Sequence, residues 1–140
     1  MDKKRLYFAH PINVYNTPLE DSLLARIAVA FPHWEVENPN QPHHSAGYER
    51  YRAGPGGPME YFLNEVVPFC HGAVVLRFRD GAWGAGVYAE ARAIQEARRP
   101  IWDITERGVV VYADMKNARV LSVDETRARV RDERGKSRPF

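Results

Sequence analysis

The chain has 140 residues, of which 44% are hydrophobic and 27% charged, and its formal net charge is +2. This length suits one domain with a buried core, and the composition is ordinary for a soluble globular protein. No apolar run approaches the ~18 residues of a membrane span, so we expect no membrane association. The basic start of the chain lacks the apolar stretch of a signal peptide, and the single cysteine, Cys70, cannot form an internal disulfide. We therefore expect a cytoplasmic protein.

The first forty residues predict a strand, a helix and a second strand. Arg5–Ala9 (RLYFA) is a short apolar run typical of a strand, and His10–Pro11 ends it because proline has no amide to donate. Thr17 suits an N-cap, and the segment Pro18–Phe31 carries apolar residues on one side at helical spacing. Trp34–Glu37 (WEVE) alternates apolar and acidic residues, which favours a strand near a sheet edge.

The middle of the chain is less regular. Asn38–Pro58 is rich in turn residues, and we expect about twenty residues without secondary structure here. Such a segment is either a functional loop, such as a lid or a binding loop, or it is disordered. Met59–Phe69 follows with apolar residues at helical spacing, which predicts a helix.

The second half predicts two more strands around a helix. The strand Ala73–Phe78 leads into a glycine-rich turn, a helix over Gly86–Ala97 and a strand over Ile101–Ile104. Val109–Ala113 and Ala118–Val123 flank a polar turn and predict a β-hairpin.

This order of elements predicts one α/β domain over residues 1–132, followed by a flexible basic tail over residues 133–140. We expect a doubly wound, flavodoxin- or Rossmann-like sheet that is mostly parallel, with helices on both faces and a C-terminal β-hairpin.

Glu90 is the most informative single residue. It stands one turn into the helix that follows the glycine-rich turn, near the edge where open α/β sheets bind ligands. The helix dipole alone favours acidic residues at such positions, so a functional role for Glu90 needs a partner. Tyr7 in the first strand is the best candidate, because a phenol can donate a hydrogen bond to a carboxylate. Ordinary core packing is the alternative for Tyr7.

The glycine-rich turn itself allows two interpretations. Gly81, Gly84 and Gly86 could bring a ligand close to free helix amides, or they could form a plain strand-to-helix turn. Neither a dinucleotide fingerprint nor a P-loop is present. Trp83 within this turn could stack on a base, although packing is the simpler role.

Other polar residues carry weaker signals. His33, His43 and His44 have no cysteine or acidic partner at ligand-like spacing, so we expect no metal. Arg77 and Arg79 stand where a phosphate would lie, or they simply face solvent.

Three segments resemble the nucleoside 2-deoxyribosyltransferase superfamily, which includes nucleoside deoxyribosyltransferases and nucleoside 5′-monophosphate N-glycosidases. They are Arg5–Ala9 (RLYFA), Gly86–Ala93 (GVYAEARA) and Arg99–Ile101 (RPI). Gly86-x-x-x-Glu90 matches the superfamily's Gly-x-x-x-Glu element, and Pro100 falls where its next strand begins. The order of elements follows the superfamily to about Ile104.

The resemblance implies specific roles. Glu90 would be the nucleophile that attacks the anomeric carbon and forms a covalent glycosyl ester, and Tyr7 would orient it. Water or a second base would then resolve the ester. The turn with Ala9, His10, Ile12 and Asn13 would lie under the sugar and base, and amides near Gly84–Gly86 would face a 5′-hydroxyl or phosphate. The resemblance implies no cofactor, and it implies a homo-oligomer, a dimer or larger.

Two positions depart from the superfamily pattern. An aspartate usually precedes the third strand, whereas here the nearest residues are Glu60, Asn64 and Glu65, and an amide cannot act as an acid. The sugar contact would therefore fall to Glu60 or Asn64. His10 stands where small residues are common in the superfamily. Its side chain could contact a phosphate or the leaving base, and the alternative is a histidine that is only hydrogen-bonded in a turn.

The expected function is thus that of a nucleoside or nucleotide N-glycosidase, or a 2-deoxyribosyltransferase-like enzyme, acting on a small molecule. The alternative is a catalytically inactive nucleotide-binding protein of the same fold. Residues 116–140 carry eight Lys/Arg and four Asp/Glu, but a solvated tail is the common case, so we expect no nucleic-acid partner.

Overall fold

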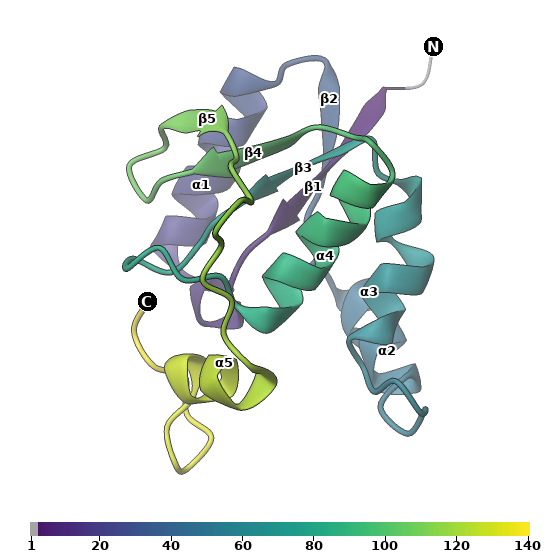
Figure 1. Cartoon of the computed structure of the whole chain (residues 1–140), viewed down its shortest axis with the longest axis vertical. Coiled ribbons are helices and arrows are strands. Elements are labelled where there is room, and N and C mark those ends of the chain that lie inside the picture. The colour runs from purple at the N-terminus through teal and green to yellow at the C-terminus, as the bar shows by residue number, and fades with distance from the viewer. Residues whose placement is uncertain (1–2) are drawn as a thin grey trace.

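A computed structural model describes residues 3–140 and shows an α/β fold built on one five-stranded sheet (Figure 1). The spatial order is β2-β1-β3-β4-β5. The strands are β1 (Lys4–Ala9), β2 (Trp34–Glu37), β3 (Gly72–Val75), β4 (Ile101–Ile104) and β5 (Val110–Tyr112). The first four are parallel, and β5 pairs antiparallel with β4. The carboxyl ends of the four parallel strands therefore meet at one edge of the sheet.

Helices cover both faces of the sheet (Figure 1). Leu6 and Phe8 of β1 belong to the core cluster that includes residues of α1 (Pro18–Ala30). Tyr7 and Ala9 belong to the opposite cluster, with residues of α3 (Glu60–Glu65) and α4 (Ala85–Glu96). The two-residue period of a strand thus sends alternate β1 side chains into two cores. In the described residues 3–140, no helix combines the length and apolar character needed to cross a bilayer.

Several predicted elements are confirmed almost to the residue. They are the strands β1, β2 and β4 and the helices α1 and α4, and β2 lies at an edge of the sheet as expected. The hydroxyl of Thr17 caps α1 by accepting a hydrogen bond from the amide of Glu20 (3.3 Å). The mostly parallel α/β sheet is likewise confirmed.

The segment Asn38–Pro58 is not unstructured, because it contains α2 (Pro42–Arg50). This helix buries only His44 and Gly47, so it has no apolar stripe for the sequence to show. Gly47 is needed where the ring of Tyr61 packs on the helix, since an added Cβ would stand 2.1 Å from Tyr61 Cε1. Tertiary contact, not helical periodicity, explains α2.

Two predicted elements are shorter than expected. The helix predicted over Met59–Phe69 is α3 followed by a 3₁₀ turn, η2 (Val67–Phe69), and Pro68 lies inside that turn. The strand predicted over Ala73–Phe78 ends at Val75.

The predicted C-terminal hairpin is wrong in its pairing. β5 pairs with β4, while Val120 in the expected second arm forms a bridge with Trp83. An unpredicted helix, α5 (Val123–Val130), follows, and Ser122 and Glu125 form its capping box. The sequence showed no core face here because the only buried residue of α5 is Val130.

The last eight residues, for which the sequence predicts flexibility, make defined contacts. The amide of Asp132 donates to the carbonyl oxygen of Lys136 (2.8 Å), and that of Arg138 donates to Val130 (2.9 Å). The ring of Phe140 lies 6.4 Å from that of Phe78.

Replacing Thr17 by alanine should lower the free energy of unfolding by about 1 kcal/mol, because the first turn of α1 loses its side-chain acceptor. Ser22→Ala on the exposed side of the same helix is the control and should change stability by less than ~0.5 kcal/mol. Chemical denaturation measures both, and equal effects would contradict the capping role.

Candidate functional site

A hydrogen bond joins β1 to α4 across 83 residues of sequence. The hydroxyl of Tyr7, a buried residue in a central strand, donates to the carboxylate of Glu90. Glu90 is the sixth residue of α4, and it faces β1 from the helix that covers this side of the sheet. The partner that the sequence requires for Glu90 is therefore in place.

The surroundings of Glu90 are aromatic rather than charged. The ring of Phe62 lies 6.4 Å from that of Tyr7 and 6.2 Å from that of Tyr48. Burial raises the pKa of Glu90 to about 7, and the hydrogen bond from Tyr7 offsets only part of that rise. Burial and the nearby Glu90 charge also hold the pKa of Tyr7 well above its usual value, so the phenol stays protonated and can donate. Tyr15 is affected by the same two causes, which places its phenol near Glu90.

Such a carboxyl has unusual chemistry for a glutamate. A pKa near neutrality lets the group act as a nucleophile or base in one state and as an acid in the other. Strongly shifted carboxyl pKa values gather at functional sites, although structural carboxyls also show them. The geometry and the pKa shift together make Glu90 the strongest candidate among residues 3–140.

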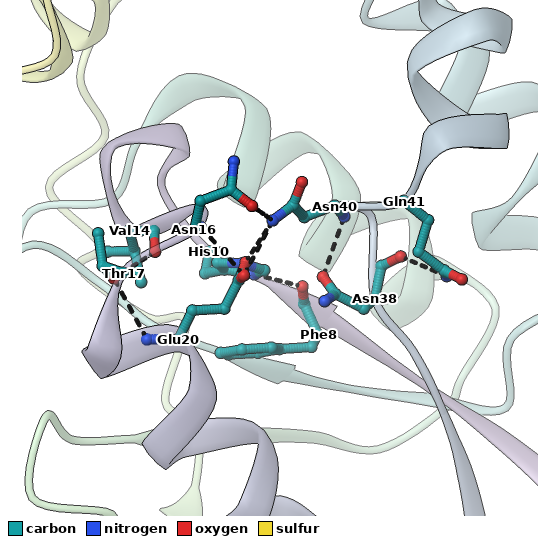
Figure 2. A network of polar contacts seen from close by, with 9 residues as sticks. All are labelled: Phe8, His10, Val14, Asn16, Thr17, Glu20, Asn38, Asn40 and Gln41. Carbon is teal, nitrogen blue, oxygen red and sulfur yellow. Dashed lines mark hydrogen bonds and ion pairs between the residues drawn. The ribbon is translucent and has the colours of Figure 1, made fainter.

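A second polar cluster lies at the carboxyl end of β1, centred on Glu20 of α1 (Figure 2). The Glu20 carboxylate accepts hydrogen bonds from His10 Nε2 (2.8 Å), Asn40 Nδ2 (2.8 Å) and the amide of Asn16 (3.2 Å). Burial works to raise the pKa of Glu20, but these hydrogen bonds outweigh it and hold the pKa below its ordinary value. The cluster ties the end of β1 to α1 and to the loop between β2 and α2.

His10 takes part in this cluster and does not face a ligand. Its Nδ1 lies 2.8 Å from the carbonyl oxygen of Phe8, its Nε2 contacts Glu20, and its ring stacks on Phe8 with centroids 4.0 Å apart. Both ring nitrogens are thus engaged and the side chain is buried. The expectation that His10 contacts a phosphate or base is wrong for this structure, and the alternative of a hydrogen-bonded turn histidine is confirmed.

The other residues at the turn after β1 differ in their burial and in their hydrogen bonds. Ala9 is fully buried at the end of the strand, whereas Ile12 is 44% exposed. Asn13 is buried and donates through Nδ2 to the carbonyl oxygen of Arg138 (3.1 Å), while its Oδ1 has no partner. Asn13 therefore keeps a free acceptor close to the sheet edge.

The glycine-rich turn is occupied by the chain's own C-terminal part. The hydroxyl of Thr126 in α5 accepts from the amide of Ala85 (2.9 Å), the first residue of α4. A Cβ added to Gly84 would lie 3.4 Å from both Phe78 and Thr126, so this part of the turn is closely packed. Gly86 is half-buried and lies close to Met59. The Ala85 amide is thus bonded to α5 and is not free for a ligand, while the expectation for the Gly84 and Gly86 amides stays a prediction.

Trp83 is also a packing residue. It is 1% exposed, and its backbone bonds the carbonyl oxygen of Arg119 and the amide of Leu121 (both 2.9 Å). Its ring meets Tyr88 edge-on, and the guanidinium of Arg77 lies 5.6 Å from the ring centroid. The indole has no free face for a base, so the stacking role is wrong.

The structure does not bring the expected second polar group to Glu90. Asn64 is exposed and lies beside the hydroxyl of Tyr51, and Glu60 is half-buried against Gly56 at the start of α3. Among the hydrogen bonds of residues 3–140, none joins Glu60 or Asn64 to Glu90. Tyr15 lies near Glu90 instead, and Phe62 lies beside the Tyr7 ring, but sequence spacing gave no signal for either.

A hollow of about 200 Å³ opens where β3 and β4 end, and both arginines considered for phosphate binding line it. Each is paired with a carboxylate: Arg77 Nε lies 3.0 Å from Asp103, and Arg79 Nε lies 3.1 Å from Glu106. Phe140 closes one side. These pairs leave little uncompensated positive charge for an anion.

Comparison with known proteins returns no match among family models, curated proteins or solved structures.

Glu90→Gln should make the protein more stable at pH 8, because the wild type then holds an ionised carboxylate in a poorly solvated position. Because the pKa of Glu90 is raised in the folded state, the wild-type protein has its full stability below the unfolded-state pKa of this carboxyl. The wild type loses that contribution as the pH rises through about 7, whereas the glutamine variant does not. We expect a gain of at most about 2 kcal/mol at pH 8 that disappears near pH 4.

Denaturation curves at both pH values measure this difference. Glu96→Gln is the control, because Glu96 is exposed on the same helix and should show no such pH-dependent gain. A Glu90→Gln protein that is less stable than the wild type at pH 8 would contradict the desolvation of Glu90.

Proposed function

We propose that this protein is an N-glycosidase or 2-deoxyribosyltransferase-like enzyme that cleaves the N-glycosidic bond of a small nucleoside or nucleotide. The observation that supports it most is the Glu90 carboxylate, held by the Tyr7 hydroxyl and raised in pKa by burial. A nucleophile and an orienting phenol are the two groups that the resemblance to the nucleoside 2-deoxyribosyltransferase superfamily requires.

The arrangement of the sheet supports the same proposal. The order β2-β1-β3-β4 agrees with the doubly wound, flavodoxin-like sheet that we propose, whose chain turns in opposite directions on either side of the first strand. Ligands of such sheets bind at the carboxyl ends of the strands at this switch point. Tyr7 stands near the end of β1, at the switch point.

The proposed reaction has two displacement steps. A carboxylate oxygen of Glu90 attacks the anomeric carbon, the carbon–nitrogen bond breaks, and its electron pair leaves with the base, which gains a proton from water. Water then attacks the same carbon, gives up a proton, and releases the sugar and the Glu90 carboxylate. Two inversions give overall retention of configuration, as in retaining glycoside hydrolysis.

The aromatic surroundings suit this chemistry. Positive charge develops on the sugar in each transition state, and a half-buried carboxylate stabilises that charge more strongly than one in bulk water. The causes of the Glu90 pKa shift are burial and Tyr7 alone, so no neighbouring cation weakens the effect. Tyr7 holds the carboxylate in place for the attack.

A specific observation favours the runner-up, a nucleotide-binding protein without turnover. Neither Glu60 nor Asn64 is hydrogen-bonded to Glu90, so no second carboxyl is paired with it to protonate a leaving base or hold the sugar. Binding of a nucleotide without release of free base would support this alternative.

The proposal includes a small-molecule substrate rather than a nucleic acid. Asp80 pairs with two arginines of the basic C-terminal part, Arg119 (3.0 Å) and Arg129 (2.6 Å). The pairing neutralises part of that charge. By the same resemblance we propose a cytoplasmic homo-oligomer that needs no cofactor, and light scattering of the purified protein tests the oligomeric state.

Incubation with a panel of deoxynucleosides, ribonucleosides and their 5′-monophosphates should release free base from at least one compound, detected by chromatography. Glu90→Ala should reduce this rate at least ~10³-fold, because the covalent route is lost. Glu96→Ala on the exposed face of α4 is the matched control and should keep full activity. Base release that persists in Glu90→Ala would overturn the proposed mechanism.

Tyr7→Phe should change the pH profile of kcat/KM as well as its size. The nucleophile must be ionised, so the rate should rise through about pH 7 in the wild type. The Tyr7 hydrogen bond lowers the pKa of Glu90, and without it the rising limb should move up by ~1 pH unit. A lower rate with an unmoved limb would show that Tyr7 acts only in packing.

A further inference from the structure

Three side chains with metal-binding atoms converge beside the Tyr7–Glu90 contact. They are Glu37, the last residue of β2, and His43 and His44 in the first turn of α2. One ligand atom from each lies within 4.8 Å of the others. The sequence gave no signal for this group, because five residues lie between Glu37 and His43 and α2 has no apolar periodicity.

His44 is fixed in the way that metal-binding histidines are fixed. It is buried, its Nε2 lies 2.7 Å from Glu37 Oε1, and its Nδ1 lies 2.8 Å from the hydroxyl of Tyr61. In metal sites the second ring nitrogen almost always has a hydrogen-bond partner that sets the tautomer and the ring orientation. Tyr61 supplies that partner from α3.

The Tyr61 hydroxyl suits both states of His44 because it can donate or accept. With Nε2 protonated, His44 donates to Glu37 and Nδ1 accepts from Tyr61. When Nε2 offers its lone pair to an ion, the proton resides on Nδ1 and the phenol becomes the acceptor.

His43 provides access from solvent. It is exposed, and its ring centroid lies 4.0 Å from that of His44 at an interplanar angle of 42°. One buried imidazole, one exposed imidazole and one half-buried carboxylate leave an open side for water. Three such ligands with an open position are the donor set of many zinc sites, and imidazole nitrogen suits divalent zinc and its neighbours in the series.

We propose that Glu37, His43 and His44 bind a divalent late first-row transition metal, with Zn²⁺ as the probe ion. On binding, the contact between Glu37 and His44 opens slightly, because ligands ~2.0–2.1 Å from a tetrahedral ion are farther apart than a hydrogen bond. The site does not depend on the proposed glycosidase function.

The metal site is nevertheless close to that candidate catalytic pair. Glu37 is the register partner of Tyr7 in the pairing of β1 and β2. The ring of Phe62 lies 5.7 Å from that of His44 and 6.4 Å from that of Tyr7, so it packs against both groups.

Calorimetric titration of the full chain with ZnCl₂ tests the proposal, and the absorption spectrum of added Co²⁺ reports the ligand geometry. We expect one Zn²⁺ per chain and a tetrahedral Co²⁺ spectrum. His43→Ala, at an exposed position that should not disturb folding, should weaken Zn²⁺ binding at least ~10-fold. His33→Ala is the matched control, an exposed histidine outside the cluster, and should bind as the wild type does.

Tyr61→Phe provides a second test, because it removes only the hydroxyl that faces His44 Nδ1 and leaves all three ligands. It should weaken Zn²⁺ binding by ~10–100-fold, with circular dichroism confirming the fold. The proposal is overturned if wild-type protein binds no Zn²⁺ at millimolar concentration, or if His43→Ala and His33→Ala bind it equally well.

Discussion

The proposed site depends on one half-buried carboxylate that has no cation beside it to compensate its charge. Burial alone would leave Glu90 protonated at neutral pH, and the hydrogen bond from Tyr7 brings its pKa back only to about 7. This arrangement lowers the stability of the folded protein, because an ionised carboxylate has a higher free energy in a poorly solvated position than in water. Such costs are characteristic of functional sites, where local stability yields to chemistry.

Strand β1 places the groups that matter on its two faces. Tyr7 points toward α4 and Glu90, while Phe8, one residue on, packs on the α1 side and stacks with His10. Glu20 then fixes His10 and the turn after β1 through a closed set of hydrogen bonds (Figure 2). These hydrogen bonds attach the turn after β1 to α1, and Tyr7, three residues before His10, donates to Glu90 on the other face of the sheet.

Local signals were enough to predict the central part of the fold. The apolar run of β1, the Thr17 cap and the spacing around Glu90 each depend on neighbouring residues, and Tyr7, the partner expected for Glu90, is hydrogen-bonded to it. What the sequence did not reveal depends on contacts between distant segments. The ring of Tyr61 packs on Gly47 of α2, and Thr126 of α5 accepts a hydrogen bond from Ala85 in the glycine-rich turn. No periodicity carries such information.

The central claim is that Glu90 forms a covalent bond to the sugar, and mass spectrometry of the intact protein tests it most directly. Protein mixed with a turned-over nucleoside or nucleotide and quenched in acid within one turnover should carry the mass of one glycosyl group. Peptide mapping should place that group on Glu90, and Tyr7→Phe should retain the same attachment site. Free base released at full rate with no adduct, or with an adduct on another residue, would contradict the account.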